Sequence, residues 1–270
     1  ACRTTDLYSS HDGYRHKGES MFQTGYCQAA GTGKSHNHDA LFNGAEIKQA
    51  KTLTTKIFSP LPDSDGLIRA AVADGVFNSP NPRLASHFWM QAFAERGRAD
   101  AAFLRREFPR FCQTMLPQNH GSSTTFAAAE ISADGQARIC NVGDSRIYHI
   151  EADGGWTQIS HDHTVLAEML EKGEARADTE YAGFYTMLAE CLIADTEEGG
   201  FKVHTAQCRL NKGDSLLLCS DGLTDSLDLP AIAKLWQSHH ALADKLEALR
   251  KAVKRMPLHD DLSIVCVQKL

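Results

Sequence analysis

TTFAAAEISADGQARICNVGDSRIYHIE, residues 124–151, reads as three successive β-strands over 124–132, 136–142 and 145–151. Apolar alternation and β-branched residues mark each of these segments as a strand. No helix is predicted between them, so this stretch lacks the β-α alternation of a parallel doubly wound sheet. It favours antiparallel strands that pair with their neighbours along the chain.

The flanking sequence extends this pattern in both directions. Further strands are predicted at 22–29, 38–43, 52–58, 67–73, 156–160, 202–210, 214–220 and 262–268. Helices are predicted at 82–97, 100–116, 163–172, 228–237 and 239–255, the first with Pro82 in its first turn and Gly97 as its C-cap. The segment 176–200 shows no clear pattern. We therefore expect an α+β fold, with a central antiparallel β-sandwich flanked by pairs of α-helices in four layers (α/β/β/α).

Composition bounds the class of protein. Of 270 residues, 42% are hydrophobic and 23% charged, which is typical of a globular chain with a sizeable core. The net charge of −6 argues against a nucleic-acid partner, because a phosphate backbone requires a cationic face. No apolar run reaches the roughly 18 residues of a membrane span. We expect a single domain over 21–270 that acts as a monomer without a membrane or nucleic-acid partner, preceded by an N-terminal extension over 1–20.

The cysteines point to a reducing compartment. The chain has eight, none of them spaced as C-x-x-C, so a zinc ribbon or a thioredoxin-like motif is not expected. Several lie in apolar runs, such as Cys140 in RICNV and Cys219 in LLLCS. Buried reduced thiols are the simplest interpretation. With no secretory signal visible, we expect a cytoplasmic protein.

Acidic residues stand where predicted strands end or begin. Asp74 follows LIRAAVA, Asp144 follows ARICNVG, Asp221 follows SLLLCS, and Asp260 and Asp261 precede LSIVCV. Asp-Gly after a strand is also a common turn dipeptide, so any one of these positions has a purely structural alternative. Neighbouring antiparallel strands can nevertheless bring several such ends together.

Carboxylates that converge need a compensating charge. Two like charges about 4 Å apart repel by roughly 4 kcal/mol at an effective dielectric constant near 20. Protonation or bound cations must remove that repulsion. Ligands that are all oxygen atoms select hard cations such as Mg²⁺ or Mn²⁺. A pair of these ions can clamp a phosphoryl group and activate a water.

Read in order, the motifs resemble the protein phosphatase 2C family in its compact bacterial form. They are GKSHNHD (33–39), VADG (72–75), GSSTT (121–125), NVGDSRIY (141–148), SHDHT (160–164), CSDGLTD (219–225) and DDLSIV (260–265). The match spans about residues 22–270. The resemblance implies a metal-dependent phosphatase that hydrolyses phosphoserine and phosphothreonine by direct attack of a water bridging two metal ions. It also implies a phosphoprotein substrate and an opposing Ser/Thr kinase.

The resemblance also assigns roles to individual residues. Asp74 matches the residue that bridges the two metal ions, and the carbonyl of Gly75 matches a further ligand. Asp221 and Asp260 match the other carboxylate ligands. Two more positions complete the set: Asp39, close to the metal-bound waters, and Asp144, for a third ion in bacterial members. The implied cofactors are two or three Mn²⁺ or Mg²⁺ ions.

The chain departs from the family pattern at two places. The first motif usually reads Arg-x-x-Asn-Glu-Asp, and here Lys34 and His38 take the Arg and Glu positions. Lys34 either attracts the phosphate as a point charge or is a solvated surface lysine. His38 either bonds a metal water or donates a proton, or it is a satisfied polar neighbour. Asp74-Gly75 is followed by residues 76–78, VFN, where the family usually has a glycine pair and some members have a histidine.

Other interpretations stay open at this point. His161, Asp162 and His163 form a triplet that could suggest zinc, although it matches a family loop in which the last two brace the chain or cap a helix. The departures around Asp74 leave room for an impaired phosphatase fold that serves as a binding or regulatory module. A metallohydrolase of small phosphoesters is a third possibility, with specificity set by the flap-like segment 176–200.

Overall fold

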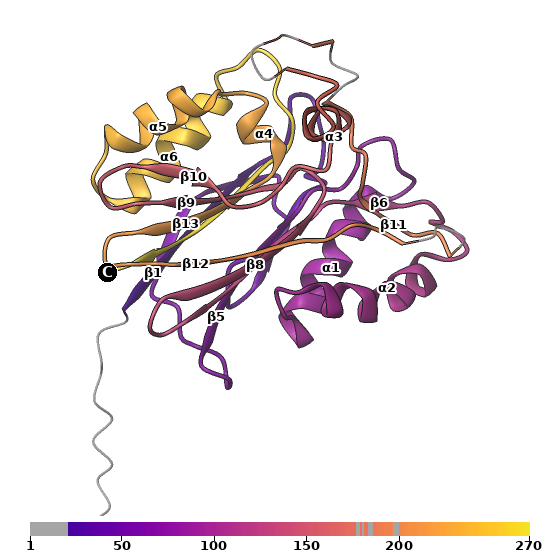
Figure 1. The fold of residues 1–270 in the computed structure, drawn as a ribbon, viewed down its shortest axis with the longest axis horizontal. Helices are drawn as coiled ribbons and strands as arrows, with labels where there is room; N and C mark the ends of the chain where they lie inside the picture. Colours follow the sequence, from indigo (N-terminus) through magenta and orange to yellow (C-terminus); the bar gives the residue numbers. More distant parts are fainter. Residues whose placement is uncertain (1–20, 177–178, 180, 183–185, 197–199) are drawn as a thin grey trace, which may run out of the picture.

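The computed structural model describes residues 21–176, 179, 181–182, 186–196 and 200–270. The predicted extension over 1–20 lies outside these residues. Two antiparallel sheets of six strands each pack face to face, and a pair of helices covers the outer face of each sheet (Figure 1). This is the predicted α+β fold with four layers.

The first sheet has the strand order β10-β9-β13-β14-β1-β4. Its strands are β1 (Phe22–Ala29), β4 (Thr52–Phe58), β9 (Arg146–Ile150), β10 (Trp156–Gln158), β13 (Ser215–Cys219) and β14 (Leu262–Lys269). Within it, β1 and β14 pair antiparallel over their full lengths, from Phe22 opposite Lys269 to Ala29 opposite Leu262. The first and last strands of the described residues therefore lie side by side.

The second sheet has the order β12-β8-β7-β5-β2-β3. Its strands are β2 (Ala40–Phe42), β3 (Ile47–Lys48), β5 (Leu67–Ala73), β7 (Phe126–Ser132), β8 (Gln136–Val142) and β12 (His204–Arg209). The short strands β6 (Ser123–Thr124) and β11 (Leu192–Ile193) form a separate ribbon. The connection from β8 to β9 passes from the second sheet to the first.

Helices α1 (Pro82–Arg96) and α2 (Ala101–Met115) cover the second sheet, and α5 (Leu229–Gln237) and α6 (Leu242–Val253) cover the first (Figure 1). Two short helices, α3 (Val165–Glu171) and α4 (Asp221–Thr224), lie near one end of the sandwich. Helix α1 begins and ends as predicted, with Pro82 in its first turn and Gly97 as its C-cap. A Cβ on Gly97 would lie 2.2 Å from the carbonyl oxygen of Phe93, so only glycine fits there.

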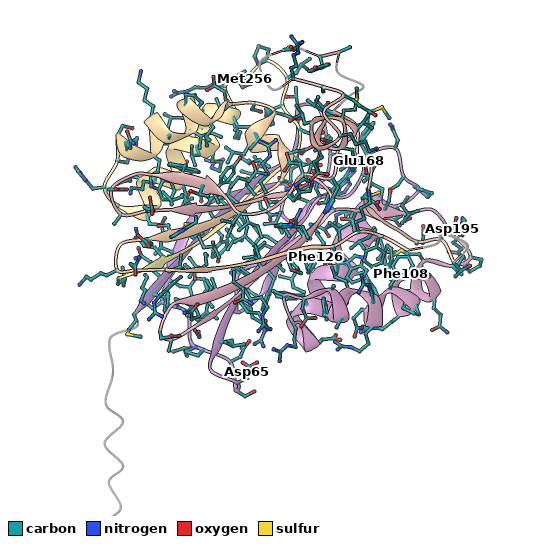
Figure 2. The ribbon with its side chains drawn as sticks, viewed as in Figure 1. Asp65, Phe108, Phe126, Glu168, Asp195 and Met256 are labelled. Carbon is teal, nitrogen blue, oxygen red and sulfur yellow. The ribbon has the colours of Figure 1, made fainter. Side chains whose placement is uncertain are left out.

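Three apolar layers hold the sandwich together. One lies between the sheets, and the other two lie between each sheet and its helices. The layer under α1 and α2 is aromatic: Phe126 of β7 lies in the interior (Figure 2) and packs against Trp89, Phe93 and Phe103, with ring centroids 5.7 to 6.2 Å apart. Such pairs contribute about 0.5–1.5 kcal/mol each beyond the area they bury.

The structure differs from the predicted elements in detail. The predicted strand 124–132 is divided, because Thr125 turns its amide to the Asp74 carbonyl. The predicted helix 163–172 begins at Val165, with Thr164 as its side-chain N-cap. Asp221 opens the helical turn α4, which was not predicted. The two-residue strand β3 is too short to produce a recognisable alternation.

Candidate metal centre

The acidic residues predicted from strand ends gather at one end of the sandwich. Asp39 precedes β2 and Asp74 follows β5, and the register places Ala40 opposite Ala73. Asp221 follows β13 and Asp260 precedes β14, whose residues Cys219 and Ile264 pair. Because antiparallel neighbours start and end at the same edge, each sheet brings two carboxylates to this end. Asp144, on the connection between β8 and β9, is the fifth.

Asp39, Asp74 and Asp221 form a hydrogen-bonded row of carboxyl groups. The Asp74 carboxyl hydrogen-bonds both Asp221 and Asp39. The Ser220 hydroxyl donates to Asp39 Oδ2 at 2.7 Å. The remaining oxygens, Oδ1 of Asp39 and Oδ1 of Asp221, are buried and have no hydrogen-bond partner within the described part of the chain. Two acceptor atoms are therefore left without a protein donor in the middle of the row.

The row holds protons in the absence of cations. Burial, with the nearby charge of Asp261, raises the pKa of Asp39 to about 8. Burial raises the pKa of Asp221 to about 6, and burial together with Asp221 and Asp39 raises the pKa of Asp74 well above its usual range. Carboxyl groups this close cannot all ionise without positive charge beside them. The row can therefore exchange its protons for cations.

The backbone of Asp74 is fixed by Thr124, the last residue of β6, and by Thr125, which follows it. The Asp74 amide donates to Thr125 Oγ1 at 2.9 Å, and its carbonyl accepts from Thr124 Oγ1 at 2.7 Å. Gly75 is buried and bridges to Thr124. A Cβ on Gly75 would lie 2.3 Å from the Pro82 carbonyl oxygen, so the start of α1 requires glycine here. The Asp-Gly pair thus serves the turn and the site together.

Asp144 is held on a braced loop beside the row. Burial, followed by the charge of Asp221, raises its pKa well above the usual range. Arg146 forms an ion pair with Asp162, with 2.6 Å from Nη2 to Oδ2. The amide of Gly143 donates to Nδ1 of His163 at 3.0 Å. Asp162 and His163 therefore brace the Asp144 loop, as one sequence interpretation proposed, whereas the α3 cap is Thr164.

Lys34 lies against the start of β14. Its ammonium group forms ion pairs with Asp260 Oδ1 and, at 2.9 Å, with Asp261 Oδ2. The Lys34 side chain is 18% exposed, so the interpretation as a solvated surface lysine is wrong. Asp260 is 48% exposed and does not join the hydrogen-bonded row, although its charge contributes to the raised pKa of Asp221. The Lys34 ammonium group is thus the positive charge that compensates Asp260.

His38 lies half-buried against the same cluster. Its Nδ1 has no hydrogen-bond partner among the residues described, and it lies 3.9 Å from Asp261 Oδ2. The ring stacks on Phe77, with centroids 6.0 Å apart and an interplanar angle of 28°. Burial lowers the pKa of His38, which favours the neutral imidazole. The interpretation of His38 as a fully satisfied polar neighbour is therefore not met.

Sequence reasoning missed the roles of Asp261 and Ser220. Asp261 is almost fully buried and accepts from the amides of Gly31 at 2.7 Å and His38 at 2.9 Å. It therefore anchors the segment that carries Lys34 and His38. Ser220 joins Asp39 to β14, because its hydroxyl also accepts from the Ser263 amide at 2.9 Å. The period-2 rule contained the signal for Asp261, since consecutive residues at a strand start point to opposite faces.

The donor set fits a hard divalent cation. Every candidate ligand side chain offers oxygen, two buried carboxylate oxygens lack partners, and the raised pKa values show that the row lacks compensating positive charge. Over the described ranges, no three His, Cys, Asp or Glu side chains converge into a preformed metal site. One of the candidate ligands, Asp260, is instead paired with the ammonium group of Lys34. The triplet 161–163 likewise gives no zinc cluster.

The candidate site opens into a cavity of about 490 Å³. The row residues Asp74 and Asp221 line it together with Lys34, Asp144 and Asp260. Other parts of its wall come from α3, from the loop after Gly75 and from residues 186–188. This volume lies within the range of about 300–1,000 Å³ typical of small-molecule sites.

Comparisons with known proteins agree with this geometry. A family model described as protein phosphatase 2C matches residues 61–256. The serine/threonine phosphatase stp of Listeria innocua serovar 6a is 30% identical over 166 residues, which span 62% of this chain and 64% of that relative. The match thus covers less than two thirds of the relative's length.

Among the helices of the described residues, none combines the length and apolar character that crossing a membrane requires.

Solved structures share the fold. The crystal structure of the Mycobacterium tuberculosis serine/threonine phosphatase PstP/Ppp matches with a TM-score of 0.71 and 20% identity, over 92% of this chain and 98% of that one. The catalytic domain of PstP in complex with two manganese ions matches with a TM-score of 0.66 and 21% identity, over 92% and 98%. At these identities the likeness concerns the fold alone.

Proposed function

Because the chain belongs to the protein phosphatase 2C family, we propose that it is a metal-dependent phosphatase that hydrolyses phosphoserine and phosphothreonine in proteins. The observation that carries the proposal is the row of Asp39, Asp74 and Asp221, with two buried carboxylate oxygens free of protein donors. A fold kept only for binding has no use for a mutually repulsive carboxyl cluster. This favours an enzyme over a regulatory module.

The proposed ligands follow the family's motif. Asp74, Asp221, Asp260 and the Gly75 carbonyl would hold two Mn²⁺ or Mg²⁺ ions, and Asp144 would hold a third. Asp39 would orient the waters on these ions through Oδ1. When bound, such ions stabilise charge on a phosphoryl group and lower the pKa of water. No nucleophilic side chain is needed for this chemistry.

The chain's own residues would prepare the site in three ways. Asp74 and Asp221, whose pKa values burial raises, would bind the ions as deprotonated carboxylates. Ser220 and the strand β14 hold Asp39 in place through the hydrogen bond to Oδ2. Lys34 supplies a fixed positive charge at the cavity wall, where it can attract the phosphate as a point charge.

The remaining expectations stay proposals. We propose that residues 21–270 act as one catalytic domain and as a monomer, opposing a Ser/Thr kinase. The free thiols of the described residues, such as buried Cys27 and Cys266, are ordinary in a reducing compartment and support a cytoplasmic location. Neither a nucleic acid nor a membrane is proposed as a partner.

The test is phosphate release from phosphoserine and phosphothreonine peptides with Mn²⁺, alongside p-nitrophenyl phosphate. The proposal expects turnover of the peptides and its loss in excess EDTA. Turnover of p-nitrophenyl phosphate alone would instead identify a small-phosphoester hydrolase. Mn²⁺ binding without turnover of any substrate would favour the regulatory module.

A further inference from the structure

Exposed apolar side chains border the cavity of the candidate site. Phe77 and Met187 are each 63% exposed and Leu170 is 37% exposed, and all three line the cavity. We call these three residues the apolar rim. Large apolar side chains that gather at one opening, rather than scattering singly, commonly mark a binding surface.

Phe77 is fixed in place on the loop after Gly75. Its ring lies 5.2 Å from the Lys34 ammonium and stacks on the His38 ring. The loop itself is held by backbone hydrogen bonds, from the Val76 amide to the Ser123 carbonyl at 3.0 Å and from Ser79 to Val76 at 2.9 Å. The part of the ring that these contacts leave uncovered is therefore presented to solvent next to the proposed phosphate site.

The backbone that carries Met187 and Leu170 is also held by hydrogen bonds. The Val165 amide donates to the Met187 carbonyl at 3.0 Å, and the Ala189 amide donates to the His163 carbonyl at 2.8 Å. These bonds tie residues 187–189 to the start of α3, the helix that carries Leu170. A preorganised surface loses little entropy when a partner binds to it.

The charged residues of the cavity do not offer an alternative contact for a flanking group. Its cationic lining residues are Lys34 and Arg146, and both are already in ion pairs, with Asp260 and Asp162. Asp225 adds a further acidic group to the lining. An acidic residue beside the phosphorylated one would therefore meet like charge, whereas an apolar one would meet the rim.

We propose that the apolar rim binds a large apolar side chain adjacent to the phosphorylated residue of the substrate, with Phe77 as a specificity-determining residue. This inference rests on the proposed function and names the substrate class within it. A phosphoryl group held at the row of carboxyl groups would place the neighbouring residues of its peptide at the cavity opening, where the rim lies. Burial of an apolar side chain there removes apolar surface of both partners from water.

Two phosphoserine peptides that differ only in the flanking residues, Leu in one and Ser in the other, test the proposal. The wild type should turn over the Leu peptide with kcat/KM at least about tenfold higher, mainly through KM. Phe77→Ala and Met187→Ala should each reduce that ratio to below about threefold, and Phe77→Leu should preserve most of it. Leu61→Ala, at an 82% exposed position outside the cavity lining, is the matched control and should leave the ratio unchanged.

The ratio separates recognition from catalysis, because any effect on the chemical step cancels between the two peptides. A wild-type ratio near one, or a ratio unchanged in both Phe77→Ala and Met187→Ala, overturns the proposal while leaving the phosphatase function intact. The same peptides with a non-hydrolysable phosphonate give Kd values that do not depend on turnover. A tenfold lower Kd for the Leu phosphonate than for the Ser phosphonate, with no hydrolysis of either phosphoserine peptide, would support the rim and refute the proposed function.

Discussion

Replacing Asp39 with Asn should stabilise the cation-free protein, and the gain should grow with pH. Asp39 is fully buried, with its pKa raised to about 8 by burial and by the nearby charge of Asp261. A group whose folded pKa is raised binds more protons in the folded state than in the unfolded state. The folded state therefore loses stability as pH rises from about 4 to about 8. Asn cannot ionise, so the variant escapes this loss.

The magnitude follows from the difference between the two pKa values. One pKa unit corresponds to about 1.4 kcal/mol, and the unfolded carboxyl has a pKa near 3.9. The Asp39 contribution then reaches on the order of 1–2 kcal/mol at pH 5 and about 4 kcal/mol at pH 7. Proton sharing with Asp74 spreads part of this over the row. We therefore expect the advantage of Asp39→Asn to grow by about 2 kcal/mol between pH 5 and pH 7.

The assay is urea unfolding in EDTA at pH 5, 6 and 7, followed by the fluorescence of the three tryptophans. Asp134→Asn is the control, because Asp134 is exposed in the turn between β7 and β8, at the far end of these strands from the site. Saturating Mn²⁺ should raise the free energy of unfolding of the wild type by more than it raises that of the Asp39→Asn variant. If the extra stability of Asp39→Asn stayed constant from pH 5 to pH 7, Asp39 would not hold a proton in the folded protein.

Three further predictions concern phosphate steering, the accessory ion and the core. In steady-state assays, Lys34→Ala should raise KM more than it lowers kcat, whereas Lys34→Arg should be tolerated. Unchanged kinetics in Lys34→Ala would exclude a role for Lys34 in steering the phosphate. Asp144→Asn should lower kcat less than Asp221→Asn does, because Asp144 would hold only an accessory ion. An equal loss of kcat in the two variants would contradict that role. Trp89→Ala should destabilise the fold by about 3–5 kcal/mol in urea unfolding, because the ring is fully buried, while exposed Leu61→Ala should stay within about 0.5 kcal/mol. A Trp89 variant as stable as the wild type would contradict the proposed aromatic layer.

The layers of the fold could be predicted because the sequence repeats strong local signals. The strands of the stretch 124–151 and the helix between Pro82 and Gly97 follow from alternation and from cap residues. The register that gathers the strand ends could not be predicted, because pairing depends on contacts distant along the chain. Helix α4 was missed because a single turn of four residues carries no periodicity.

The candidate site could be located from the sequence in outline but not in its contacts. The strand-end carboxylates Asp74 and Asp221 meet as expected, because each follows a buried strand at the same end of the sandwich. That Lys34 pairs with Asp260 could not be read from residues 226 positions apart. The exposed Phe77 was noted only as a departure from a glycine pair, and its stacking on His38 depends on tertiary structure.

The most direct test of the central claim is phosphopeptide hydrolysis by wild type, Asp74→Asn and Asp221→Asn over a Mn²⁺ titration. We predict wild-type turnover that saturates with Mn²⁺ and disappears in EDTA. In both variants kcat should be at least about 10²-fold lower, a larger loss than changes around a metal's ligands usually cause. All three proteins should remain folded, as thermal melts in EDTA would show. Activity that survives chelation, or variants that match an active wild type, would contradict the assignment of the carboxyl row as the metal centre.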